Sequence, residues 1–432
     1  MSDLQFLYEQ TALLNMASIK DTAQQLMPTL YEIKDSLEKK YTTDYASLYL
    51  PFDKELLKKV QTLVAEKKKL DPVLVVVIGI GGSNLGTMAV QKALLGKMYP
   101  QILYADTVDT DYISDLLNIT ERYLQQQKTV IVNVLSKSGT TTETVANFEL
   151  FLALLQQYHP TNYKDYIVVT TDKDSKLWHL AEKERFSCLE IPGLVGGRFS
   201  VLSAVGLFPL GLLNITIEQL LAGAQDMQKK CLDQNLYKNP ALASACIKYL
   251  HYTKGISIAD MFLFSVDAEA LGKWYRQLMG ESLGKTVTDT TTKVGITPTV
   301  TIGSTDLHSV GQLYLGGPKD RFTTFVSFEK NKHTLAVPDN KEFGSIVANI
   351  QNRPLSSIMH AIIEGTQRAY SKTDLPFCSV ILPQKNEYYL GQFLQMYMLE
   401  IIYLGKLLDV NPFDQPHVEL YKKETREILA HE

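Results

Sequence analysis

Cysteine is scarce in this chain, which has four cysteines among 432 residues. They are Cys188, Cys231, Cys246 and Cys378, and no two of them form a C-x-x-C pair. This scattering argues against a structural zinc site. A chain of this length buries enough apolar surface to be stable without disulfides. Reduced cysteines in the cytoplasm therefore fit the sequence better than secretion.

An excess of charge of one sign is also absent, with 43 Lys and Arg against 47 Asp and Glu. Without a Lys/Arg-rich stripe the chain has no footprint for nucleic acid, so we expect no such partner. The longest apolar run, residues 201–213, is interrupted by Ser203, Gly206 and Pro209. It is shorter than the roughly 20 residues of a membrane helix. We expect a buried helix there, no membrane partner, and no signal peptide at the start.

Residues 1–50 are predicted to form an N-terminal helical arm, because apolar side chains recur at three- and four-residue spacing and glycine is absent. Residues 72–78 then form an unbroken apolar run that suits a strand buried on both faces. Similar runs at 102–104, 129–135 and 166–171 alternate with helical patterns at 85–95, 143–157 and 175–183. This alternation predicts a first domain over 51–215, with a parallel sheet between two layers of helices.

A second alternation predicts a similar domain over residues 216–410. Its expected strands are 261–266, 299–302, 322–328 and 377–382, and its expected helices include 268–279, 355–370 and 387–408. The threonine-rich stretch 286–301 is a loop or an edge ribbon, and 411–432 is a C-terminal helical segment. The fold class is therefore α/β, with two α-β-α sandwich domains around parallel sheets.

Two loops follow predicted strands and open predicted helices, where anions bind in open α/β sheets. The first, Gly79-Ile-Gly-Gly-Ser-Asn-Leu-Gly86, lets backbone N–H groups face a ligand, although an ordinary tight turn is equally consistent with it. It lacks the Gly-Lys-Ser/Thr ending of a Walker loop. The second, Ser136-Lys-Ser-Gly-Thr-Thr-Thr-Glu-Thr144, places several hydroxyls in one turn. Helix capping needs only one hydroxyl, so we favour a phosphate site over a simple N-cap.

Two further segments carry charged candidates. Arg198 follows two glycines in Gly-Gly-Arg-Phe-Ser, which suits an arginine held beside a developing oxyanion, or equally one that caps a helix. Glu281, in Met-Gly-Glu-Ser-Leu-Gly-Lys, lies near a predicted helix C-terminus. A carboxylate there either points to solvent or has a raised pKa suited to proton transfer, and taken alone we expect it in solvent. His308 and the segment 413–422 indicate nothing by themselves.

Taken together, these segments resemble the phosphoglucose isomerase family. Gly-Ile-Gly-Gly-Ser, Ser-Lys-Ser-Gly-Thr-Thr-Thr-Glu, Gly-Gly-Arg-Phe-Ser, Gly-Glu-Ser-x-Gly-Lys, Ser-Thr-Asp-Leu-His-Ser and Phe-Asp-Gln-Pro-x-Val-Glu-x-x-Lys occur in the order of that family, in its shorter bacterial form. Each motif alone is modestly specific, but the ordered set is highly specific. The motifs run from Gly79 to Lys422, which is nearly the whole chain.

The resemblance implies a fold and a reaction. Each half would be a sugar-isomerase (SIS) domain, in a homodimer whose active site combines residues of both subunits. The reaction would be the reversible conversion of D-glucose 6-phosphate to D-fructose 6-phosphate, in glycolysis and gluconeogenesis, with a sugar phosphate as the only ligand and no metal or organic cofactor.

The resemblance also implies roles for individual residues. Glu281 would carry the proton between C1 and C2, and Arg198 would stabilise the enediolate. His308, from the neighbouring subunit, and Lys422 would open the sugar ring, and Gln415 would position the substrate. The phosphate would be bound by Gly82, Ser83, Ser136, Ser138 and Thr141, with Lys137 adjacent.

Elementary chemistry agrees with these roles. Opening a cyclic hemiacetal needs a proton donor at the ring oxygen and an acceptor at the C1 hydroxyl. A carboxylate can then ionise the weakly acidic C–H only if the enediolate is stabilised electrostatically. One carboxylate on one face of a cis-enediol can return the proton to the neighbouring carbon.

The chain departs from the family pattern at His417, where the family usually has glycine. A left-handed backbone there would make the side chain costly, although we expect activity to be retained. Two other functions stay open at this point. One is a sugar-phosphate sensor, which would need the phosphate loop but neither Glu281 nor Lys422. The other is an isomerase that also accepts mannose 6-phosphate.

Overall fold

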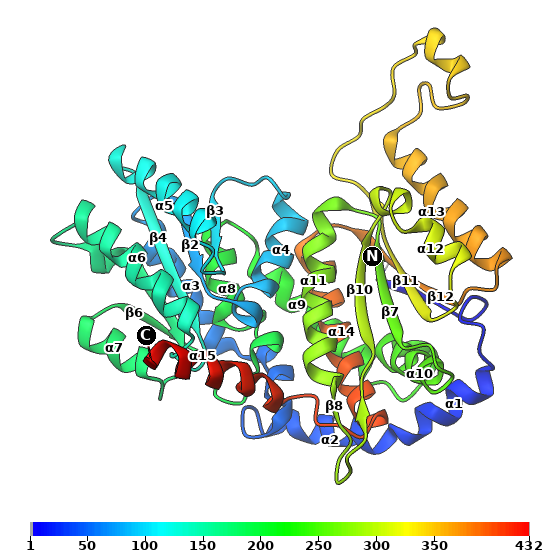
Figure 1. Ribbon diagram of the computed structural model, residues 1–432, viewed down its shortest axis with the longest axis horizontal. Coiled ribbons are helices and arrows are strands. Elements are labelled where there is room, and N and C mark those ends of the chain that lie inside the picture. Colours follow the sequence, from blue (N-terminus) through cyan, green and yellow to red (C-terminus); the bar gives the residue numbers. More distant parts are fainter. Residues whose placement is uncertain (1–2, 432) are drawn as a thin grey trace.

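The computed structural model describes residues 3–431, and Figure 1 shows two α/β halves side by side with a layer of helices between them. The sheet of the first half has the order β3-β2-β4-β5-β6, and every strand pair in it is parallel. The strands are β2 (Pro72–Ile78), β3 (Ile102–Ala105), β4 (Thr129–Ser136), β5 (Ile167–Thr171) and β6 (Ser187–Glu190). The helices are α3 (Lys54–Lys68), α4 (Leu85–Leu95), α5 (Thr110–Gln125), α6 (Thr142–Tyr158), α7 (Lys176–Glu184) and α8 (Ala204–Leu212).

The interior strand β2 is buried on both faces, as its apolar run predicts. Leu74, Val76 and Ile78 pack in a cluster with residues of α5, α6 and α7. Val75 and Val77 point the other way, into the core between the two halves. Alternation along one strand thus supplies two apolar layers. The buried helix expected over 201–213 is α8, and all nine of its residues are buried.

The second half contains a sheet in the order β1-β12-β11-β7-β10. Its strands are β1 (Gln5–Leu7), β7 (Ile258–Leu263), β10 (Thr297–Ile302), β11 (Arg321–Lys330) and β12 (Phe377–Gln384). Its helices are α9 (Ile217–Cys231), α10 (Pro240–Thr253), α11 (Glu269–Leu283), α12 (Gly311–Gly316), α13 (Leu355–Lys372) and α14 (Glu387–Leu407). The threonine-rich stretch contains a separate two-stranded ribbon of β8 (Lys285–Thr286) and β9 (Lys293–Val294), which pairs with neither five-stranded sheet, and it continues into the edge strand β10.

The N-terminal arm is not helical throughout, so that prediction is wrong at its start. Its first described element is the strand β1, which pairs antiparallel with β12 and makes the second sheet mixed. The helices α1 (Met16–Gln25) and α2 (Met27–Glu38) follow, and then the 3-10 turn of Asp44–Leu48. Three residues are too few to show a periodic pattern, and their partner strand lies more than 370 residues away. The domain limits predicted at 215 and 410 stay predictions.

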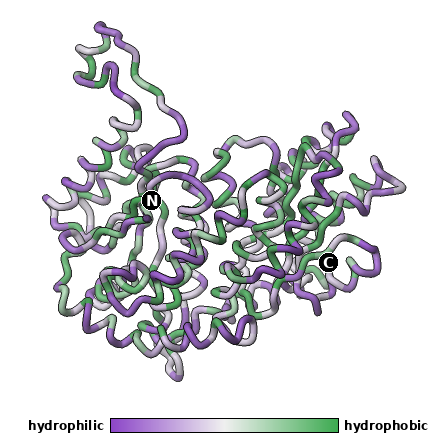
Figure 2. Tube along the Cα trace, turned by 180° about the vertical axis from the view of Figure 1, so that it is seen from behind, coloured by the Kyte–Doolittle hydropathy of each residue, from purple (hydrophilic) through white to green (hydrophobic). Residues whose placement is uncertain are grey.

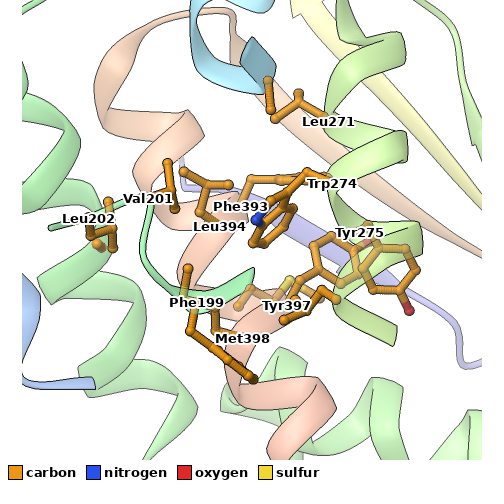
Figure 3. Packing of buried hydrophobic residues seen from close by; sticks show 14 of the residues in the cluster. Phe199, Val201, Leu202, Leu271, Trp274, Tyr275, Phe393, Leu394, Tyr397 and Met398 are labelled. Atoms are coloured by element: carbon orange, nitrogen blue, oxygen red, sulfur yellow. The ribbon is translucent and has the colours of Figure 1, made fainter. Parts of the chain in front are cut away.

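A continuous core lies between the two sheets and fixes the elements that carry the site (Figure 3). Trp274 and Tyr275 of α11 pack there against Phe393 and Tyr397 of α14. Phe199, next to Arg198 in sequence, enters the same core from the first half. Since α11 carries Glu281 near its end, one packed core holds both charged candidates in place.

Two segments stand apart from this core. Residues 331–354, between β11 and α13, project as an arm at the top of Figure 1, and a bridge between Ala336 and Pro354 closes its base. Figure 2 shows hydrophobic stretches along this arm. The last helix, α15 (Glu419–His431), lies beside the first half and has no buried residue. Within residues 3–431, no helix is both long and apolar enough to cross a bilayer.

Candidate active site

The two predicted anion loops lie at the same edge of the first sheet. Strand β2 pairs with β4, with Ile78 opposite Val134, so the loops that leave these strands are neighbours. Ser83 closes the short 3-10 turn η3 (Gly81–Ser83) after β2, and Ser136 ends β4. Both loops thus start at the carboxyl ends of adjacent parallel strands, where such sheets bind ligands.

The hydroxyls of the second loop bond to each other rather than cap a helix. Ser136 Oγ lies 2.9 Å from Thr141 Oγ1 and accepts a bond of 3.1 Å from the Gly139 backbone N–H. Thr141 is the N-cap residue of α6, yet its side chain makes no capping bond. The first N–H groups of α6 therefore have no side-chain cap, which favours anion binding over the capping alternative. Ser138 is exposed on the same loop.

Lys137 and Arg198 affect each other electrostatically. Burial lowers the pKa of Lys137, the Arg198 charge lowers it further, and Asp172 opposes both effects. The loop from β4 and the arginine therefore bring two cations into one region. Such a region suits a dianionic phosphate.

Arg198 lies in η5 (Gly197–Phe199) and is 2% exposed. Its Nε donates to Ser282 Oγ at 2.7 Å, and its Nη1 donates to Gln415 Oε1 at 2.7 Å. Its Nη2 donates to the backbone carbonyls of Pro412 and Asp414 at 2.7 and 2.8 Å. The guanidinium is therefore fixed by two separate segments, the end of α11 and residues 412–415, rather than capping one helix, the alternative left open by the sequence.

Gly82 allows the first loop to approach this arginine. A Cβ at Gly82 would lie 2.3 Å from the carbonyl carbon of Gly197 and 2.5 Å from the Arg198 backbone nitrogen. These contacts are shorter than any side chain tolerates, so only glycine permits this backbone packing. The glycine places Ser83 beside the arginine loop.

Glu281 faces Arg198 and does not point freely to solvent, so the expectation from the helix end alone is wrong. Its Oε2 lies 3.4 Å from Arg198 Nη1. Its Oε1 accepts a bond of 2.9 Å from Gln277 Nε2, one turn earlier on α11. Each oxygen thus has a partner, while the Glu281 side chain is 31% exposed and stays accessible to a ligand.

Three residues of this arrangement were not identified from the sequence. Ser282 orients Arg198, and Gln277 orients Glu281 while its own Oε1 is buried with no partner among the described residues. Lys285 bonds to the Asp414 side chain and to the backbone carbonyls of Asn411 and Asp414. The signal for Ser282 and Lys285 was their place in the Glu281 motif. For Gln277 it was the four-residue helical spacing to Glu281.

Within the described residues of one chain, His308 and Lys422 are not bonded to this cluster. His308 is exposed in η8 (Thr305–His308), after β10 of the second half. Lys422 lies on α15 and pairs with Glu419 at 2.8 Å. Among the described residues, neither makes a hydrogen bond or an ion pair with Arg198 or Glu281.

His417 has an ordinary backbone conformation. It lies in the 3-10 turn η10 (Pro416–Val418) and is not one of the non-glycine residues with positive φ. The strain that a left-handed glycine position would impose is therefore absent. Gln415, two residues before His417 in the chain, keeps its bond to Arg198.

A cavity of about 630 Å³ lies elsewhere, between α3, α7 and β6. It is lined by residues such as Lys58, Lys59, Trp178 and Cys188, none of which contacts Arg198 or Glu281. Burial raises the pKa of Cys188 to about 11, so this thiol is not a nucleophile at neutral pH. The residues that suit the predicted reaction therefore lie in the Arg198 cluster rather than in this cavity.

Comparisons with known proteins agree with this geometry. A sequence model described as phosphoglucose isomerase matches residues 54–432. The glucose-6-phosphate isomerase of Exiguobacterium sibiricum is 36% identical over 393 residues, covering 88% of this chain and 85% of that protein. The glucose-6-phosphate isomerase of Carboxydothermus hydrogenoformans is 33% identical over 440 residues, covering 98% and 93%.

A solved structure shares the whole architecture. The crystal structure of a hypothetical protein from Thermus thermophilus has a TM-score of 0.88 and 31% identity, and the match covers 99% of this chain and 100% of that one. Together with the ordered motifs and the Arg198–Glu281 pair, these matches show that the chain belongs to the phosphoglucose isomerase family.

Proposed function

We propose that this protein interconverts D-glucose 6-phosphate and D-fructose 6-phosphate by ring opening and proton transfer through a cis-enediolate. The observation that carries the proposal is the Glu281 carboxylate 3.4 Å from the buried Arg198 guanidinium, beside a loop rich in hydroxyls. This arrangement supplies a base, an oxyanion stabiliser and a phosphate site in one region. The free cysteines support a cytoplasmic location.

The phosphate is held by the loops that follow β2 and β4. Ser83, Ser136, Ser138 and Thr141 offer hydroxyls, and the start of α6 offers backbone N–H donors and a partial positive charge. Gly82 adds backbone at close range, and Lys137 contributes charge without direct contact. Neutral donors and one cation suit the phosphate of a sugar.

Glu281 and Arg198 carry the isomerisation. Glu281 removes the proton from C2 of the open aldose, and the C–H electron pair forms the C1–C2 double bond while negative charge develops on O1. Arg198 stabilises that charge. The O2 hydroxyl proton then passes to O1, and the protonated Glu281 returns its proton to C1 as the C2 carbonyl forms. Gln277 fixes the orientation of the Glu281 carboxylate, and Gln415 fixes that of the Arg198 guanidinium.

Ring opening belongs to His308 and Lys422, with His308 supplied by the neighbouring subunit of a homodimer. One of the two donates a proton to the ring oxygen while the other accepts the proton of the C1 hydroxyl. The exposure of His308, and the absence of a bond between it and Glu281 within the described chain, support this division. A site completed in this way requires a second copy of the chain.

The projecting arm supports the same homodimer. It exposes Leu335 (66%), Phe343 (56%), Ile346 (74%) and Val347 (50%). An apolar patch that extends away from the body of a protein is typical of a protein–protein interface. A second copy of the chain is the partner that would cover the arm and also deliver His308.

A coupled assay with glucose 6-phosphate and mannose 6-phosphate side by side tests the function and its specificity. Compared with the parent protein, the variant Glu281→Gln should exchange the C2 hydrogen with solvent about 10²- to 10⁴-fold more slowly, because a general base usually contributes that much. Sugar-phosphate binding should persist, because the phosphate loops are unchanged. Glu38→Gln, which alters an exposed carboxylate at the end of α2, is the matched control. Binding of fructose 6-phosphate without turnover by the parent protein would instead indicate a sensor.

A further inference from the structure

The segment that carries His308 is held firmly although the histidine itself is exposed. A Cβ at Gly303 would lie 2.4 Å from the Phe264 ring, so the chain leaves β10 flat against that ring. Leu307 and Val310 pack on the aromatic cluster that includes Phe264 and Tyr314. The backbone on both sides of His308 is thus anchored in an apolar cluster, which limits where the imidazole can lie.

A buried carboxylate joins the two ends of this segment. Asp260 of β7 is 1% exposed, and its Oδ1 accepts bonds from Thr301 at 2.8 Å and Tyr314 at 3.2 Å. Thr301 and Tyr314 also lie 2.7 Å apart through their hydroxyl oxygens. Thr301 precedes His308 and Tyr314 follows it, so a single side chain clamps the segment at both ends. Thr299 donates to the same oxygen at 2.6 Å from the strand alone.

Arg321 completes the clamp from β11. Its guanidinium carbon lies 4.2 Å from the centroid of the Tyr314 ring, within the range of a cation–π contact. This contact fixes the plane of the tyrosine whose hydroxyl reaches Asp260. The segment is therefore located by a carboxylate, an arginine and an apolar cluster together.

Stability alone does not explain a carboxylate at this position. Burial raises the pKa of Asp260, while its hydroxyl donors and Arg321 oppose that effect. Its Oδ2 has no hydrogen-bond partner among the described residues. Burying a charged group with incomplete partners costs free energy, and well-packed apolar residues are often as stable or more so. The advantage of the carboxylate lies in the geometry that it imposes on Thr301 and Tyr314.

We infer that Asp260 is a positioning residue for ring opening: by clamping the ends of segment 301–314 it sets the place of His308, which acts in the neighbouring subunit. The inference rests on the proposed role of His308. It assigns to Asp260 no contact with the sugar, because the carboxylate is buried beneath the segment. The effect of Asp260 must therefore pass through His308.

The experiment is a double-mutant cycle on the full-length protein. Asp260→Asn keeps the shape of the side chain and removes the charge, and it is measured alone and together with His308→Ala. The readouts are kcat, KM and the exchange between α and β anomers of glucose 6-phosphate, which follows ring opening directly. Asp260→Asn alone should lower kcat and anomer exchange about tenfold or more, with KM little changed. When Asp260→Asn is combined with His308→Ala, kcat and anomer exchange should fall little below the values of His308→Ala alone.

Two further variants provide a second test and a matched control. Tyr314→Phe removes the hydroxyl that ties the segment to Asp260 and should reproduce a smaller part of the loss, even if Asp260→Asn folds poorly. Thr299→Val removes an equivalent bond to the same oxygen without touching the segment and should leave anomer exchange near the parent value. Thermal unfolding of every variant separates folding defects from positioning.

The outcomes distinguish the inference from the role on which it rests. The positioning role would be overturned if Asp260→Asn lowered anomer exchange by the same factor in the parent protein and in His308→Ala. Unchanged anomer exchange in both Asp260→Asn and Tyr314→Phe would also overturn it. Normal anomer exchange in His308→Ala alone would instead overturn the proposed role of His308.

Discussion

Arg198 donates to Ser282 Oγ at 2.7 Å across 84 residues of sequence, and this bond fixes the guanidinium beside Glu281. The remaining donors engage Glu281, Gln415, Pro412 and Asp414, so the five donors of the guanidinium all have partners. Arg198 therefore joins η5, α11 and the segment before α15. An arginine held in this way needs no rearrangement when negative charge develops beside it, which is the basis of electrostatic catalysis.

The first prediction concerns this guanidinium. Arg198→Lys keeps the charge but cannot reproduce five fixed donors, so we expect kcat to fall about 10²- to 10³-fold, as when an oxyanion donor is removed. Steady-state kinetics in both directions measure the loss. Arg368→Lys, on the exposed face of α13, is the control. A change confined to KM would show that Arg198 binds the ground state and the transition state equally.

The second prediction concerns the projecting arm. Ile346→Asp places a charge on the most exposed of its large apolar side chains. If a second copy covers the arm, the substitution should weaken the dimer and lower activity in proportion, because each site then loses the partner's histidine. Light scattering coupled to gel filtration gives the mass at several protein concentrations. Met98→Asp, at a site 90% exposed on the first half, is the control. An unchanged mass for Ile346→Asp would show that the arm is not part of the dimer interface.

Much of the fold could be predicted from the sequence because its strongest signals are local. The apolar run of β2 indicates a strand buried on both faces, and the structure confirms it with two apolar layers. The strand β1 gives no such signal. Its three residues become a strand only because the edge of β12 offers backbone partners at Ser379, Val380 and Ile381. Pairing of that kind is decided by tertiary contact.

The active-site residues also fall into those with a local sequence signal and those that depend on tertiary contacts. The loops at Ser83 and Ser136 could be located because strand, glycine-rich turn and helix follow each other directly in the chain. Ser282 could not be assigned a function, since its partner Arg198 is distant in sequence. The solvent-facing expectation for Glu281 failed for the same reason: a helix-end argument omits an arginine supplied by the other half of the molecule.

The third prediction concerns the departure from the family pattern. His417 is exposed in a 3-10 turn with no left-handed backbone, so replacing it with glycine relieves no strain. We expect His417→Gly to change kcat/KM by less than about tenfold, or roughly 1.4 kcal/mol of barrier. Turnover measured side by side with the parent protein checks this. A larger gain would show that the histidine disturbs Gln415 or Lys422.

The fourth prediction links acidification to the attachment of the N-terminal arm. His251 of α10 is buried, its Nε2 lies 2.8 Å from the Ala12 carbonyl oxygen, and its ring stacks on Phe322 at 4.9 Å. Burial lowers the pKa of His251 from its ordinary value of 6.5 to about 4, with a smaller contribution from Lys254, while the Ala12 bond opposes the shift. The unfolded chain therefore binds a proton that the folded chain excludes. Stability from this group is fully present above pH 6.5 and is lost as the pH falls toward 4.

The loss has a magnitude that urea unfolding can measure. At pH 5 the shift corresponds to about 2 kcal/mol of destabilisation relative to pH 7.5. His251→Gln retains a side-chain donor for Ala12 but does not titrate, so the variant should lose about 2 kcal/mol less than the parent between these two pH values. His179→Gln, exposed on α7, should keep the acid response of the parent. An identical response in His251→Gln would mean that other groups govern acid unfolding and that His251 accepts its proton without opening the contact with the N-terminal arm.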